Sequence, residues 1–113
     1  MKAVVFNGVG EPLRLEELEL EAPRAGEVRV RLAAAGVCHS DLHVVEGGWT
    51  HHTPIVLGHE GACVVVEVGE GVADLAVGDH VILSWMPSCG SCRQCGVGRP
   101  WLCEAALDAM ETD

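Results

Sequence analysis

The chain has 113 residues, of which 49% are hydrophobic and 21% charged, and this composition is that of one globular domain. Its net charge of -10 argues against nucleic acids or an anionic membrane as partners, because both are bound by basic surfaces. No apolar run approaches the ~20 residues that cross a bilayer, and the N-terminus is unlike a secretory signal, so we expect a cytoplasmic protein.

The first third of the chain predicts short strands separated by turns. Residues 2–6 form a β-branched run that ends at an Asn-Gly turn. Residues 13–20 alternate between apolar and charged side chains with one slip in phase, which fits a bulge or two short strands. Residues 27–33 alternate regularly and predict a third strand.

The middle of the chain predicts a short helix and two more strands. Ser40 and Asp41 are good N-cap residues, so a helix is expected from there to Glu46, followed by irregular structure over 49–57. Residues 62–68 are almost continuously apolar, which predicts a strand buried on both faces. Residues 80–83 predict a further strand.

The remaining residues predict a glycine- and cysteine-rich loop over 87–103 and a helix over 104–113. The chain as a whole is therefore expected to be mostly β, with about six strands. Its two irregular excursions contain nearly all the residues that can carry chemistry.

Four cysteines in the second excursion have the spacing C-x2-C-x2-C-x7-C, and they are Cys89, Cys92, Cys95 and Cys103. Pairs of cysteines two residues apart can bind one ion from a tight turn, and four thiolates are the ligands of structural zinc. The segment has little else to form a core, so the metal would hold it together.

Two alternatives remain for these cysteines. The first three spacings fit an iron–sulfur cluster, although the gap of seven residues and the following Glu104 do not. Two disulfides are disfavoured in a cytoplasmic protein. The sixth cysteine, Cys63, lies in an apolar strand and is interpreted as a core residue.

A second candidate site involves Cys38 and His59, each next to or near a glycine. Cys38 begins the sequence Cys-His-Ser-Asp, and His59 and Glu60 lie between two glycines. Spacing alone does not separate a metal site from a buried thiol and an ordinary loop histidine.

These motifs together carry a family resemblance. Residues 36–41 (GVCHSD), residues 58–61 (GHEG) and the four-cysteine segment resemble, in order and spacing, the zinc-dependent alcohol dehydrogenases of the medium-chain dehydrogenase/reductase superfamily. The resemblance extends from the first strand to Cys103. It implies a GroES-like distorted β-barrel with a protruding zinc lobe at about residues 87–105, the whole chain forming part of a catalytic domain.

The resemblance also implies a role for each matching residue around a catalytic zinc. Cys38 and His59 would be ligands, with Glu60 as a neighbouring group or alternative ligand. Asp41 would accept a hydrogen bond from the His59 ring. Ser40 would bind the substrate oxygen, and His43 would continue a proton relay to solvent.

Further implied roles concern the cofactor and the substrate. His39 would face the cofactor pyrophosphate, and Trp49 and Trp85 would line the substrate pocket. Cys89, Cys92, Cys95 and Cys103 would bind the structural zinc. The activity implied is oxidation of small alcohols or reduction of aldehydes with NAD or NADP.

Two parts of such an enzyme have no counterpart in this sequence. No intact G-x-G-x-x-G opens a helix after a strand, so no nucleotide-binding Rossmann domain is predicted, and the family's third zinc ligand is also missing. We therefore expect a fragment without activity of its own, from an enzyme that is a homo-oligomer at full length. A non-catalytic zinc-binding interaction module and a small iron electron-transfer protein are the alternatives.

Overall fold

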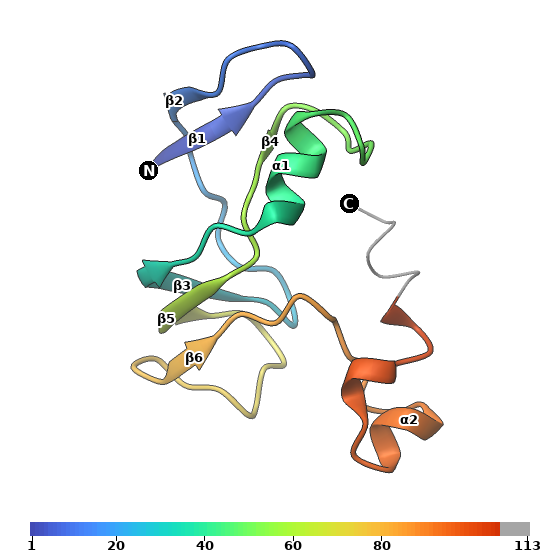
Figure 1. Ribbon diagram of the computed structural model, residues 1–113. Helices are drawn as coiled ribbons and strands as arrows, with labels where there is room; N and C mark the ends of the chain where they lie inside the picture. The colour runs from blue at the N-terminus through green and yellow to red at the C-terminus, as the bar shows by residue number, and fades with distance from the viewer. Residues whose placement is uncertain (107–113) are drawn as a thin grey trace. The chain divides into compact units, whose positions relative to one another are not determined.

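The structure is a computed structural model that describes residues 1–106. The chain divides into two units, and the boundary along the sequence falls between Leu83 and Ser84. The first unit contains all six strands of the described chain and one helix, and the second contains two short helical turns (Figure 1). The mostly β fold class is confirmed. The strands form two three-stranded sheets and do not close into a barrel within the described residues.

The first sheet has the order β2-β1-β4, with β1 (Lys2–Phe6) antiparallel to both β2 (Arg14–Glu17) and β4 (Ile55–Val56). Val5 and Phe6 on β1 are each only 3% exposed and contribute to the core of the first unit. Strand β4 lies within the segment that was expected to be irregular, since two residues are too few to show an alternating pattern.

The second sheet has the order β3-β5-β6, formed by β3 (Val28–Ala35), β5 (Gly61–Val68) and β6 (His80–Ile82). The central strand β5 buries alternate residues, among them Cys63 and Val65, while Ala62 and Val66 are exposed. The prediction that this strand is buried on both faces is therefore wrong. In an antiparallel sheet one face can remain open even where the sequence is apolar on both.

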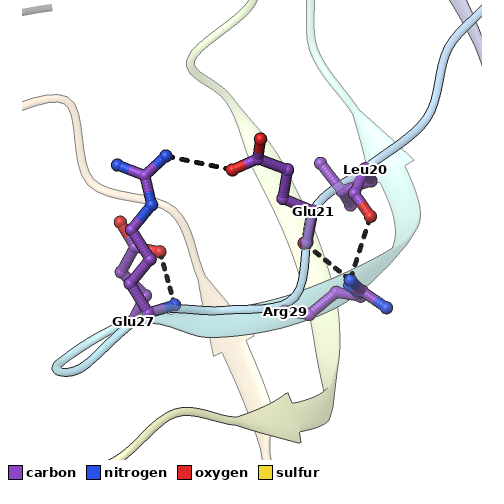
Figure 2. Close-up of polar contacts among 5 residues, drawn as sticks. Leu20, Glu21, Glu27 and Arg29 are labelled. Atoms are coloured by element: carbon purple, nitrogen blue, oxygen red, sulfur yellow. Dashed lines mark hydrogen bonds and ion pairs between the residues drawn. The ribbon is translucent and has the colours of Figure 1, made fainter.

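Arg29 on β3 holds the segment that precedes this strand in place. Its guanidinium donates hydrogen bonds to the carbonyl oxygens of Leu20 and Glu21, at 3.1 and 2.6 Å (Figure 2). The same guanidinium forms an ion pair with Glu67 on β5, at 2.8 Å. Arg29 thereby ties the segment between β2 and β3 to the central strand.

The second unit is built from α2 (Arg93–Gly96) and the 3-10 turn η1 (Pro100–Leu102). Its buried residues in the described part are Cys103 and Ala106. The expected loop over 87–103 thus contains two helical turns, each too short for periodicity to reveal. A helix was expected over residues 104–113, and most of that range, residues 107–113, lies outside the described residues. Within residues 1–106 no helix has the length and apolar character needed to cross a membrane.

Candidate metal centres

Cys38 is positioned at the N-terminus of helix α1 (His39–Val45). Its backbone is extended, with φ -108° and ψ 150°, and Cys38 itself is the N-cap, so the prediction of Ser40 or Asp41 as the cap is wrong. Asp41 is instead the third residue of the helix, where its Oδ2 accepts a hydrogen bond from the backbone N–H of Cys38 at 3.1 Å. A carboxylate at this position stabilises the first turn and fixes the backbone of the cap residue.

His59 precedes β5, and its two ring nitrogens face different groups. Nδ1 lies 3.5 Å from Oδ1 of Asp41. Nε2 lies 3.4 Å from Oγ of Ser40 and 3.9 Å from Oε1 of Glu60. The ring is therefore held between a carboxylate of α1 on one edge and a cluster of polar donors and acceptors on the other.

Cys38, His59 and Glu60 each offer one ligand atom, and these three atoms all lie within 4.8 Å of one another. Cys38 and His59 are half-buried, while Glu60 is exposed. A thiolate, an imidazole and a carboxylate are all zinc ligands, so the donor set fits that ion. Sequence spacing did not determine this cluster on its own.

The four cysteines of the second unit form the other cluster, with all four sulfurs within 4.8 Å of one another. Their sulfurs accept hydrogen bonds from backbone N–H groups: Cys89 N to Cys103 Sγ at 3.3 Å, Cys92 N to Cys89 Sγ at 3.3 Å, and Cys95 N to Cys92 Sγ at 3.5 Å. Backbone N–H donors lower the pKa of Cys89 and of Cys92, because they stabilise the thiolate form. All four are free cysteines, and the donor set fits a closed tetrahedral zinc site.

The thiols of this cluster have different affinities for protons. The hydroxyl of Ser91 donates to Cys89 Sγ at 3.6 Å, and this bond, with backbone N–H donors, lowers the pKa of Cys89 to about 6. Partial burial raises the pKa of Cys95 to about 11, with the neighbouring Cys92 adding to the effect. Ser91 was not among the predicted site residues, although its place between Cys89 and Cys92 was a signal for it.

The remaining predicted residues lie on α1 and in the loops. His39 and His43 are both exposed, with ring centroids 4.7 Å apart, and the His43 ring lies 5.9 Å from that of Trp49. Trp49 belongs to the first unit and Trp85 to the second, so their shared substrate pocket stays a prediction.

An open hollow of about 400 Å³ adjoins the Cys38, His59 and Glu60 cluster in the first unit. Glu60 itself forms part of its wall. The rest of its lining is apolar and consists of Ala34, Ala35, Gly36, Gly61, Ala62, Ile82 and Leu83.

Comparison with known proteins identifies the family of this fold. Residues 24–110 match the alcohol dehydrogenase GroES-like domain. The chain is 50% identical over 110 residues to the NDMA-dependent alcohol dehydrogenase of Amycolatopsis methanolica, a match that covers 97% of this chain and 30% of that protein.

Solved structures give the same result. The alcohol dehydrogenase zinc-binding domain protein from Burkholderia ambifaria superimposes with a TM-score of 0.85 at 42% identity, over 94% of this chain and 28% of that one. The cobalt- and zinc-bound thermostable alcohol dehydrogenase from Pyrobaculum aerophilum superimposes with a TM-score of 0.82 at 40% identity, over 94% of this chain and 33% of that one.

The chain thus spans about 30% of the length of these relatives. Within that span the match includes both cysteine-containing motifs, and the fold agrees along nearly the whole chain. The chain belongs to the alcohol dehydrogenase GroES-like domain family.

Proposed function

We propose that this chain is the catalytic-domain portion of a zinc-dependent alcohol dehydrogenase, an enzyme that interconverts alcohols and aldehydes with a nicotinamide cofactor. The observation that carries the proposal is the cluster of Cys38, His59 and Glu60, whose ligand atoms lie within 4.8 Å of one another. A purely structural module has no need of three zinc-binding groups next to a hydroxyl and a histidine-bearing helix.

Around this cluster, each residue of the chain has a distinct task. Cys38, His59 and Glu60 would hold the catalytic zinc, whose Lewis-acid charge favours loss of a proton from an alcohol. Asp41 lies 3.5 Å from His59 Nδ1, which orients Nε2 toward the other two ligands.

Ser40 and His43 provide a route for the substrate proton. Ser40 is half-buried beside His59, whereas His43 is exposed one helical turn further along α1. The hydroxyl would hold the substrate oxygen, and the imidazole would transfer the proton to solvent near neutral pH.

The cofactor and the substrate require further groups. His39, exposed at the start of α1, would contact the cofactor pyrophosphate. Trp49 and Trp85 would limit the substrate pocket to small or slender alcohols. The binding domain for NAD or NADP, together with a further zinc ligand, would belong to the part of a full-length dehydrogenase that these 113 residues do not supply.

The four cysteines of the second unit would hold a structural zinc. The close approach of their sulfurs supports a metal, and C-x2-C-x2-C-x7-C departs from the iron–sulfur spacing. The second unit buries few side chains in its described part, so the ion would contribute directly to its folding.

Metal analysis of the purified chain tests the proposal. We expect two zinc ions per chain, one for each cluster, and no visible absorption. Cys38→Ser should retain only the zinc of the four-cysteine cluster, and Cys92→Ser should retain only the zinc of the Cys38, His59 and Glu60 cluster. Cys63→Ser serves as a cysteine control and should keep both. One zinc in the unmodified chain would favour the non-catalytic module, and a visible iron chromophore would favour an electron-transfer protein.

A further inference from the structure

Gly36 lies two residues before Cys38 and directly against the side chain of Glu60. A Cβ atom placed on Gly36 would lie 2.0 Å from Oε2 of Glu60 and 3.1 Å from both its Cβ and Cδ. The three nearest atoms thus all belong to Glu60. Contacts below 3.0 Å between such atoms do not occur in proteins, so the carboxylate occupies space that any other residue at position 36 would fill.

The backbone of Gly36 does not itself require glycine. Gly36 is absent from the glycines with positive φ, so an L-residue can adopt its conformation. Its N–H donates to the carbonyl oxygen of Glu60 at 3.2 Å, a bond that alanine would preserve. A side chain at position 36 would therefore compete with Glu60 for space, and the flexible end of Glu60 is the group that would have to shift.

The position of this carboxylate matters because it is part of the metal cluster. Glu60 Oε1 lies 3.9 Å from His59 Nε2, and a Glu60 oxygen lies within 4.8 Å of both other ligand atoms. The adjoining hollow of about 400 Å³ gives a displaced carboxylate somewhere to go.

We propose that Gly36 is a positioning residue that keeps the Glu60 carboxylate beside Cys38 and His59. A side chain at position 36 would move this carboxylate out of the cluster. This inference rests on the proposed zinc site and adds to it a residue that binds no metal itself.

The test measures Co²⁺ binding to the chain after one equivalent of zinc has filled the four-cysteine site. Titrations followed by visible absorption give both the affinity and the spectrum of the remaining site. We expect Gly36→Ala to weaken Co²⁺ binding by about tenfold and to give the spectrum of Glu60→Ala. Gly8→Ala is the matched control, because the Cβ at that position has only one near neighbour, Glu11 Oε1 at 3.8 Å.

A double-mutant cycle separates positioning from general damage. In the Glu60→Ala background, Gly36→Ala should have no further effect on Co²⁺ affinity, because the displaced group is already gone. If Gly36→Ala alone does not fold, the Gly36→Ala/Glu60→Ala chain should regain the native circular dichroism spectrum. Unchanged affinity in Gly36→Ala, or equal losses in both backgrounds, would overturn the inference.

An NMR measurement on the chain without Co²⁺ distinguishes this inference from the proposed function. Cross-relaxation between the α protons of Gly36 and the side-chain protons of Glu60 is expected in the unmodified chain. A chain that shows these contacts but takes up no Co²⁺ would contradict the zinc site and leave the packing of Gly36 intact. Absence of the contacts would overturn the role of Gly36 whatever the metal does.

Discussion

One carboxylate, that of Asp41, contacts both of the segments that carry the proposed metal ligands Cys38 and His59. Its Oδ2 accepts from the backbone N–H of Cys38 at 3.1 Å, and its Oδ1 lies 3.5 Å from Nδ1 of His59. Cys38 and His59 are 21 residues apart in sequence; Cys38 caps α1, and His59 lies two residues before β5. Asp41 therefore fixes the distance between them without occupying a ligand position.

Replacement of Asp41 by Asn should weaken metal binding at this site. The amide loses the negative charge opposite His59, and only one of its two atoms can accept a hydrogen bond. We expect Co²⁺ affinity of the Cys38, His59 and Glu60 site to fall about 10- to 100-fold, measured by the absorption titration described above. Asp79→Asn is the control, since Asp79 also accepts a backbone N–H, from Ala76 at 2.8 Å. Equal affinities of the two variants would contradict the role assigned to Asp41.

The residues of both candidate metal centres could be named from the sequence and the family resemblance, but the distances between them could not. The four-cysteine spacing is local, so a single turn-rich segment determines it. The second cluster depends on the pairing of β3 with β5, which sets where Gly36 and Glu60 meet. Spacing says nothing about such a long-range contact, and it was the resemblance to a family that pointed to Cys38 and His59.

Among the elements, β5 shows how far an apolar run can mislead. Val65 is fully buried, with 0% exposure, while its neighbour Val66 is 37% exposed. Both are valines in the same strand, and the sequence gives no reason to separate them. Successive side chains of a strand point to opposite faces of the sheet. Only the face that carries Val65 is covered by other residues of the first unit.

Substitution of these two valines by alanine should have unequal effects on stability. Val65→Ala leaves a cavity in a packed core and should lower the free energy of unfolding by about 2 kcal/mol. Val66→Ala removes a partly solvated side chain and should change it by less than about 0.5 kcal/mol. Urea denaturation followed by circular dichroism measures both values. Comparable losses would show that the outer face of β5 is covered in solution.

The other elements were predicted with uneven success for equally physical reasons. Strand β1 was predicted to its exact residues, because a turn bounds it at Asn7-Gly8. The helix cap was predicted two or three residues too late, since Ser40 and Asp41 are better N-caps than Cys38 in isolation. Cys38 takes the cap position because Asp41 bonds back to its N–H.

For the molecule as a whole, the two units differ in what holds them together. The first has two sheets and a core that includes Val5, Phe6, Val44 and Val65. The described part of the second buries only Cys103 and Ala106. A bound ion is therefore expected to matter far more to the second unit than to the first.

Removal of zinc should loosen the second unit selectively. After treatment with a strong chelator, we expect rapid proteolytic cleavage between residues 84 and 106, with the first unit still intact. Mass spectrometry of the fragments locates the cuts. The zinc-loaded Cys38→Ser chain is the control, because it lacks only the other site and should resist cleavage. Equal resistance before and after chelation would show that the second unit folds without metal.

The isolated chain should not oxidise alcohols. Steady-state assays with simple primary alcohols and either NAD or NADP are expected to show no turnover above a protein-free blank. The reason is that these 113 residues match about 30% of the length of a related alcohol dehydrogenase and contain no dinucleotide-binding motif. Turnover that disappears in Cys38→Ser would contradict this expectation and would place the whole activity within these 113 residues.

The four sulfurs of the second unit also bear on the order in which the chain acquires its structure. All four lie between residues 89 and 103, so capture of an ion closes only short loops, and the entropy lost in closing a loop rises with its length. Cys38 and His59 must instead await the pairing of β3 with β5, whose partners are up to 40 residues apart, as Val28 and Val68 are. The four-cysteine cluster can thus form as a local event, before the strands that bring Cys38, His59 and Glu60 together have paired.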